Sequence, residues 1–259
     1  MRPRSANQKQ SQMPPRPSRK RSNRDLLEKN RHFYDLLWAD ASLVEPQRFN
    51  TWPLVQSLLS KSGQRLEVAP GLRPRLPILG TQFVDISAPA LAKLRGFGAQ
   101  VVLSQVTSLP FSAGAFDLVS ALDIIEHVDD DITALSELSR VMKPGGTLLI
   151  STPLHASLWT SFDDFVGHKR RYDPSYLLSK LAQQHFLVER SAVFGMQPRS
   201  SRLVDIGMRL LLQHRKPAMW WYNRVFMPLG LRFQQKLRIN PGMIAASDVD
   251  EILLVCRRA

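Results

Sequence analysis

The sequence predicts an α/β fold in which a mostly parallel sheet carries helices on both faces. Short apolar runs, bounded by glycine, proline or polar residues, alternate with segments of helical periodicity. Such an alternation indicates a parallel sheet whose strands are buried on both faces. A chain of 259 residues is long enough to bury one sizeable core, so a single domain over residues 25–259 is expected.

Seven apolar runs are assigned as strands. They are Arg65–Ala69, Gln82–Ile86, Gln100–Leu103, Phe116–Ala121, Thr147–Ser151, Phe186–Glu189 and Glu251–Cys256. Helices are expected between them at Ala88–Leu94, Asp131–Val141 and Tyr176–His185. Two N-terminal helices are expected within residues 25–60, one starting at Asp25 and one over Arg48–Ser60.

Composition excludes several classes of protein. Cys256 is the only cysteine, which excludes an intrachain disulfide and a CxxC-type zinc site. No stretch approaches the roughly 18 uncharged apolar residues of a membrane span, and the N-terminus lacks the apolar region of a signal peptide. A cytoplasmic protein, or one peripheral to a membrane, is expected.

The net charge of +13 is concentrated at two places. Residues 1–24 contain eight Lys or Arg and no acid, and their composition predicts disorder. This tail is interpreted either as a solubilising extension or as an electrostatic arm for nucleic acid or anionic lipid. A second basic segment, about residues 194–248, is too long for a simple connection and contains Trp220 and Trp221. It is interpreted as a substrate-side insertion, either a cap over the active site or an interfacial amphipathic segment.

A glycine turn followed by a carboxylate predicts a nucleotide-type cofactor. Glu67 and Gly71 lie at the end of the first strand, and Asp85 ends the second. Glycine lets the backbone approach a ligand closely, and an acid about 20 residues further on can accept hydrogen bonds from both ribose hydroxyls.

The downstream motifs resemble those of class I S-adenosylmethionine-dependent methyltransferases, in particular the group related to ubiquinone and menaquinone biosynthesis. The matching segments are Ser108–Phe111, Ala115–Val119, Asp123–Val128 and Leu138–Ile150. The resemblance covers about residues 65–189. It implies a seven-stranded Rossmann-like sheet with an antiparallel last strand, and S-adenosyl-L-methionine as the cofactor.

The resemblance also implies roles for individual residues. Glu67 and Gly71 would line the methionine part of the cofactor, while Ala69 and Arg73 occupy positions where the family usually has glycine. Arg73 would either pair with the cofactor carboxylate or point to solvent. The remaining implied cofactor residues are Asp85 at the ribose, Ile86 on the adenine face, Gln105 and Val106 flanking the adenine, and Asp123 near the sulfonium.

Two histidines, His127 and His168, are candidates for a catalytic base. Methyl transfer is an in-line displacement that needs a base only when the acceptor must lose a proton. The order Asp123-x-x-Glu126-His127 also resembles a metal-binding motif of some ubiquinone O-methyltransferases and small-RNA 2′-O-methyltransferases, so a metal stays an open alternative. Arg170, Arg171 and Tyr172 lie in a basic loop after the fifth strand, interpreted either as a solvated turn or as a substrate-binding loop.

Three functions follow from these observations. The first is methyl transfer to a small-molecule or lipid-like acceptor, with peripheral contact to an anionic membrane as a further expectation. The second is a nucleic-acid methyltransferase, which the basic tail favours. The third is a non-catalytic binding protein with a methyltransferase fold, which the altered residues Ala69, Arg73 and Gln105 favour.

Overall fold

The computed structural model describes residues 31–59, 63–195 and 201–259. The basic tail over residues 1–24, and residues 25–30 at the start of the predicted N-terminal helix, lie outside the described residues. Residues 31–40 form a helix, as the N-terminal periodicity predicts.

The described strands form a single sheet in the order β3-β2-β1-β4-β5-β8-β6-β7. Their bounds are β1 Arg65–Val68, β2 Thr81–Asp85, β3 Gln100–Leu103, β4 Phe116–Leu122, β5 Met142–Pro153, β6 Phe186–Phe194, β7 Asn240–Pro241 and β8 Glu251–Arg258. Strands β1 to β5 are parallel to one another, whereas β8 runs antiparallel to both of its neighbours. The predicted fold class is confirmed. The sheet has eight strands rather than seven, because a two-residue segment of the insertion pairs with the edge of β6.

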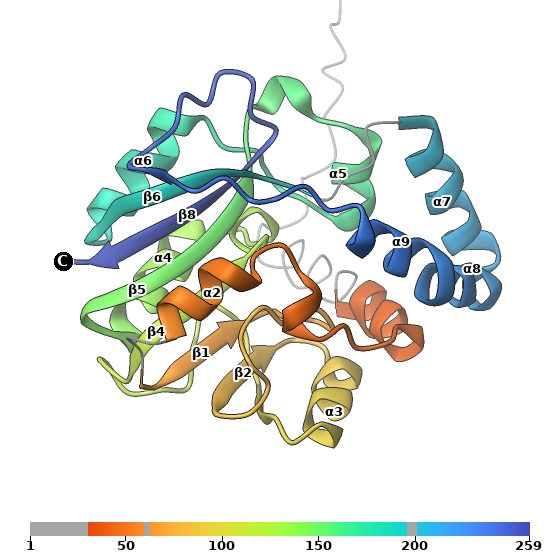
Figure 1. The fold of residues 1–259 in the computed structure, drawn as a ribbon, viewed down its shortest axis with the longest axis horizontal. Helices are drawn as coiled ribbons and strands as arrows, with labels where there is room; N and C mark the ends of the chain where they lie inside the picture. The colour runs from red at the N-terminus through yellow and green to blue at the C-terminus, as the bar shows by residue number, and fades with distance from the viewer. Residues whose placement is uncertain (1–30, 60–62, 196–200) are drawn as a thin grey trace, which may run out of the picture.

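Helices cover both faces of this sheet (Figure 1). The helices are α2 Trp52–Leu59, α3 Ala88–Gly96, α4 Asp131–Val141, α5 Ser161–Val166, α6 Pro174–Gln183, α7 Ser201–Gln213, α8 Arg215–Trp221 and α9 Met227–Arg232. Successive strand residues point to opposite faces, so Val119 packs with α4 and α6 while Leu118 packs with α2. The strands are therefore buried on both sides, as their unbroken apolar runs predict.

The insertion packs against the N-terminal helix. Its helices α7 to α9, with a π-helical turn at Tyr222–Phe226, lie together on one side of the molecule beside residues 31–40 (Figure 1). Buried Met219 joins the cluster that contains Trp38, and Arg215 forms an ion pair of 2.9 Å with Asp40. Two segments far apart in the sequence thus meet beyond the carboxyl ends of the first strands.

None of the described helices is both long and apolar enough to cross a bilayer.

Gly146 and Gly96 offer a matched test of packing in the sheet. A Cβ at Gly146 would lie 2.9 Å from the Lys143 carbonyl oxygen and 3.3 Å from two carbonyl oxygens of β4, whereas a Cβ at Gly96 meets nothing within 4 Å. We expect Gly146→Ala to lower the free energy of unfolding by about 1–3 kcal/mol in urea denaturation, because backbone atoms cannot move aside cheaply. Gly96→Ala at the end of α3 should leave it unchanged or raise it slightly. Equal effects of the two substitutions would contradict this packing.

Candidate active site

Backbone strain marks the carboxyl ends of β1 and β4. Ala69 is the first residue after β1, and Asp123 is the first residue after β4. Both have left-handed backbone conformations, with φ of 55° and 50°. Such conformations are unfavourable for residues other than glycine, and they concentrate at functional sites. The two residues therefore lie at the carboxyl edge of the sheet, and open α/β folds bind their ligands in a crevice at that edge.

Two buried carboxylates organise the turn after β1. Glu67 accepts backbone N–H groups from Arg75 and Leu76, and Asp85 accepts them from Gly71 at 3.0 Å and Ser87 at 2.8 Å. Burial raises the pKa of Glu67 to about 7 and that of Asp85 to about 6. The structure thus brings the predicted glycine turn and the predicted ribose carboxylate together.

The polar groups of this turn fit an adenosyl cofactor. A carboxylate has about four lone-pair positions, and the backbone N–H groups of Gly71 and Ser87 use only part of the acceptor capacity of Asp85. The remaining lone pairs suit a ribose diol. Gly71 has a φ of +53°, a left-handed conformation that favours glycine.

Aromatic side chains from residues 31–40 cover the same turn. A Cβ at Gly71 would lie 2.2 Å from Cζ2 of Trp38, so the indole rests directly on the glycine. Tyr34 stacks near Trp38 with ring centroids 6.3 Å apart, and the charged groups acting on its phenol include Asp85, Asp123 and Glu126. Sequence analysis missed both rings as site residues. Their spacing of four residues places them on one helix face, but only the tertiary fold lays that face on the crevice.

Arg73 does not point freely into solvent. Its guanidinium lies 5.4 Å from the ring centroid of Trp38 and 5.1 Å from that of Tyr222, and burial lowers its pKa to about 10. This cation therefore links the N-terminal helix, the glycine turn and the insertion. A role for Arg73 at the cofactor carboxylate stays a prediction.

The other predicted cofactor residues lie along the same edge. Ile86 is half-buried beside Asp85, Gln105 is exposed after β3, and Val106 is buried in the main core. The Asp123 carboxylate accepts the hydroxyl of Ser151 at 2.5 Å. Their individual contacts with a cofactor stay predictions.

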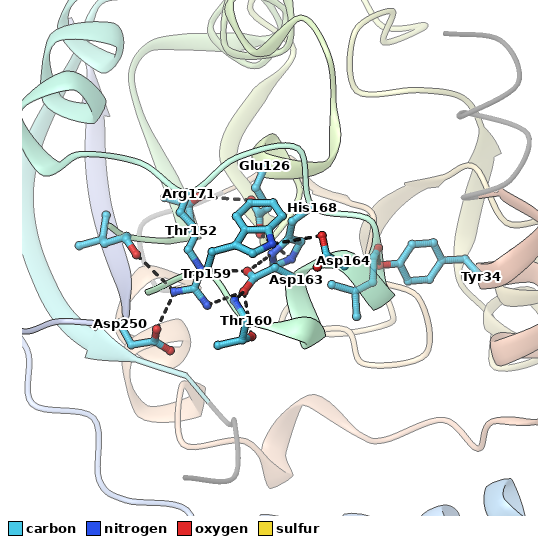
Figure 2. A network of polar contacts seen from close by, with 12 residues as sticks. Tyr34, Glu126, Thr152, Trp159, Thr160, Asp163, Asp164, His168, Arg171 and Asp250 are labelled. Atoms are coloured by element: carbon cyan, nitrogen blue, oxygen red, sulfur yellow. Dashed lines mark hydrogen bonds and ion pairs between the residues drawn. The ribbon is translucent and has the colours of Figure 1, made fainter. Parts of the chain in front are cut away.

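A second polar cluster lies between β4 and α5 (Figure 2). Its centre is Asp163, a fully buried carboxylate that contacts the His168 Nδ1 atom at 2.7 Å and accepts two hydrogen bonds from Arg171 at 2.9 Å and 3.0 Å. Arg171 also donates to Asp250 at 2.6 Å. Burial acts to raise the pKa of Asp163, but the hydrogen bonds from Arg171 and His168 outweigh it and lower that pKa to about 2.

The predicted substrate-binding residues have partners within the protein. The Arg171 side chain is fully buried in its two ion pairs, Arg170 pairs with Asp131 at 2.8 Å, and the Tyr172 hydroxyl donates to the same Asp131 at 2.9 Å. These partners occupy donors that an anionic acceptor would need, and the substrate-binding role of the three residues stays a prediction. The run of charges had suggested solvent exposure, and buried acids from distant segments explain the difference.

The predicted catalytic histidines lie side by side. The ring centroids of His127 and His168 are 4.6 Å apart, and His127 also meets the Tyr34 ring edge-on at 5.9 Å. Burial, and then the charge of His168, lower the pKa of His127 to about 3, and burial lowers the pKa of His168. An imidazole with so low a pKa is a weak base, and the catalytic role of both residues stays a prediction.

Comparison with known proteins decides the class of the domain. Residues 79–150 match the protein family described as a methyltransferase domain. The fold of the chain matches that of class I methyltransferases. A SAM-dependent methyltransferase from Thermotoga maritima has the same fold, with a TM-score of 0.56 at 16% identity, covering 92% of this chain and 97% of that one.

Other similar proteins share parts of the chain. The UbiE C-methyltransferase of ubiquinone and menaquinone biosynthesis from Bdellovibrio bacteriovorus is 36% identical over 28% of this chain and 32% of its own length. A bovine protein named as a probable tRNA methyltransferase 9B is 29% identical over 48% of this chain and 29% of its own length. The chain thus spans about a third of the length of these curated relatives. A phosphoethanolamine N-methyltransferase 2 from Haemonchus contortus, solved with S-adenosylhomocysteine, gives a TM-score of 0.52 at 18% identity, covering 91% of this chain and 60% of that one.

Asp163 offers a test of the second cluster. We expect Asp163→Asn to lower the free energy of unfolding at pH 7 by about 3 kcal/mol, because it leaves the buried Arg171 cation without its main partner. Since the folded-state pKa of Asp163 lies below its ordinary value of 3.8, at about 2, its contribution is complete above pH 4 and lost as the pH falls towards 2. Denaturant titrations of both proteins across this range measure the difference.

The neighbouring Asp164 provides the control. It is exposed and accepts one hydrogen bond from Trp159, so Asp164→Asn should change stability by roughly 0.5 kcal/mol or less. The difference in free energy of unfolding between the wild type and Asp163→Asn should shrink between pH 5 and 2. A constant difference over this range would argue against an ionised Asp163.

Proposed function

We propose that this chain transfers a methyl group from S-adenosyl-L-methionine to a small, lipid-like acceptor. The observation that carries the proposal is the meeting of the Gly71 turn and the Asp85 carboxylate at the carboxyl edge of a class I methyltransferase sheet. The cofactor, when bound, supplies an electrophilic methyl group on its sulfonium.

The protein's own task in such a reaction is to hold and align. Asp85 would bind the ribose hydroxyls, the backbone of Gly71 would lie against the cofactor, and Asp123 would stand at the sulfonium side. The ring of Trp38 would exclude water, since it lies on Gly71, and Tyr34 stacks on Trp38. Alignment of acceptor and methyl group supplies most of the rate in a displacement of this kind.

The insertion supports a lipid-like acceptor. Several of its large apolar side chains are exposed: Ile206, Leu210, Trp220, Trp221, Phe226, Leu229 and Phe233. Cations accompany them, including Arg224, whose guanidinium lies 5.6 Å from the Trp220 ring. Tryptophan and phenylalanine beside arginine suit the interface of an anionic lipid layer. Tyr222 of the insertion contacts Arg73 of the glycine turn. An acceptor held at a lipid surface by the insertion would therefore lie next to the cofactor site.

Asp85 offers the test of the cofactor site. We expect the wild-type chain to bind S-adenosylhomocysteine in isothermal titration, and Asp85→Asn to weaken that binding roughly 10- to 100-fold, because hydrogen bonds to a charged acceptor are lost. Asp117→Asn is the matched control, since Asp117 lies near the opposite end of the sheet and pairs with Lys143. Absence of any binding by the wild-type chain would favour the non-catalytic alternative and sink the enzyme proposal.

The tryptophan pair offers the test of the lipid surface. We expect the chain to sediment with phosphatidylglycerol vesicles, and replacement of both Trp220 and Trp221 by alanine to weaken this binding roughly 10-fold or more. Phe97→Ala is the control, since Phe97 is 59% exposed at the end of α3, outside the insertion. Binding to RNA that the tryptophan variant retains, without vesicle binding by the wild type, would favour the nucleic-acid alternative.

A further inference from the structure

Three side chains beside the crevice direct unused lone pairs at one another. Glu126, His127 and His168 each offer a ligand atom, and these three atoms all lie within 4.8 Å of one another. Among the described residues, Glu126 Oε1 and His127 Nδ1 have no hydrogen-bond partner although both atoms are buried, and His168 Nε2 lies 3.9 Å from Glu126 Oε1. Buried acceptors without a partner cost free energy, so this arrangement calls for a ligand.

The other atoms of the same groups are held by the protein. Glu126 Oε2 accepts the Thr152 hydroxyl at 3.2 Å, and His127 forms a hydrogen bond with the backbone of Gly167. His168 Nδ1 lies 2.7 Å from the Asp163 carboxylate. Because two hydrogen bonds from the Arg171 guanidinium keep Asp163 ionised, the carboxylate can only accept. The proton is therefore on Nδ1, and Nε2 keeps its lone pair.

This is the architecture of a metal centre. Histidine ligands typically donate their second N–H to a carboxylate or a backbone carbonyl, which fixes the ring and its tautomer. Here each imidazole is held by a hydrogen bond at the ring nitrogen that faces away from the cluster. The Glu126 carboxylate is held through Oε2, which leaves Oε1 available. Tetrahedral zinc with nitrogen and oxygen ligands at about 2.0–2.2 Å places neighbouring ligand atoms about 3.4 Å apart. The separation of 3.9 Å between Glu126 Oε1 and His168 Nε2 is close to that value.

We propose that Glu126, His127 and His168 bind a divalent first-row transition-metal ion, with Zn²⁺ as the reference ion. Two imidazoles and one carboxylate leave at least one coordination position for an exogenous oxygen. Asp123, which the sequence pattern groups with Glu126 and His127, is exposed and already accepts the Ser151 hydroxyl. His168 takes its place, from a loop 41 residues further along the chain than His127.

The position of this site suggests its use. The Tyr34 ring lies between the two regions: it meets the His127 ring edge-on at 5.9 Å and stacks at 6.3 Å on Trp38, which rests on Gly71. An ion beside the crevice would bind the oxygen of a hydroxyl or phenol acceptor and favour loss of its proton to solvent. That oxygen would then form the bond to the methyl carbon as the carbon–sulfur bond breaks, with its electron pair going to sulfur. This use rests on the proposed function, whereas binding of the ion does not.

The test uses the full chain without an affinity tag, freed of metal by a chelator. Titration with Co²⁺, followed by its visible ligand-field absorption, should show one tight equivalent that Zn²⁺ displaces. Glu126→Gln and His168→Gln should each weaken binding roughly 100-fold or more, since loss of an outer partner alone typically costs 10- to 100-fold. His214→Gln, an exposed histidine of the insertion, should bind Co²⁺ as the wild type does.

Two readouts keep folding and function separate from metal binding. Zn²⁺ should raise the melting temperature of the wild type but not that of Glu126→Gln, which replaces a buried carboxyl by an amide of the same shape and should stay folded. Absence of a stoichiometric Co²⁺ spectrum in the wild type, or an unchanged spectrum in Glu126→Gln, would overturn the site. The same samples are also titrated with S-adenosylhomocysteine. Binding of this ligand without a Co²⁺ site would contradict the metal proposal alone and leave the methyltransferase proposal standing.

Discussion

The buried ion pair between Asp163 and Arg171 is the interaction on which the site side of the molecule depends. Asp163 belongs to α5, while Arg171 lies between the carbonyl of Leu154, just after β5, and Asp250, just before β8. A buried pair of this kind is costly to break, because removal of either partner leaves a charge without compensation. It therefore fixes α5 and the following loop to the ends of two central strands. The position of His168 near Glu126 follows from that constraint (Figure 2), and so does its ring contact with His127.

A second constraint holds the cofactor side. Glu67 and Asp85 use their buried oxygens to bind the backbone of the turn that Pro74 and Pro77 prevent from becoming a regular helix. Carboxylates thus replace the helical hydrogen bonds that the prolines remove. Trp38 and Arg73 then close over the turn, so the region that should admit a cofactor is also the place where the N-terminal helix packs. Binding of a ligand there and packing of that helix are necessarily coupled.

Local sequence predicts the framework well because the framework obeys local rules. The β3 strand and the α4 helix begin and end where their apolar patterns predict, and Asp130 caps α4 by accepting the N–H of Thr133. The β5 strand extends back to Met142, through a Lys-Pro-Gly-Gly stretch that reads as a turn, because Met142 pairs with Phe116 of β4. Strand bounds of this kind depend on a partner, which periodicity does not contain.

The site was predictable only where its residues lie within one strand–loop unit. Gly71 follows β1 and Asp85 ends β2, and these two strands are parallel neighbours, so their meeting follows from the sheet. Arg171 and Tyr172 were placed at a substrate because their neighbours in sequence are basic, whereas their neighbours in space are Asp163, Asp250 and Asp131. Tyr34 and Trp38 were missed for the same reason, since nothing in a helical pattern tells which of its faces covers a cleft.

Buried acidic residues connect the predicted cofactor site with the proposed metal site. Glu126 and Glu251 are buried near Asp123, and burial, followed by the negative charge of Asp123, raises the pKa of both glutamates. The cation among them, Arg75, lies over the ring of Phe49 with its centre 3.6 Å from the ring centroid, and its Nη1 atom has no hydrogen-bond partner. Negative charge on Glu126, Glu251 and Asp123 would favour a positively charged occupant beside them. A sulfonium at the end of β4 and a divalent ion between Glu126 and the two histidines would each relieve that repulsion, and binding of one would reduce the electrostatic gain left for the other.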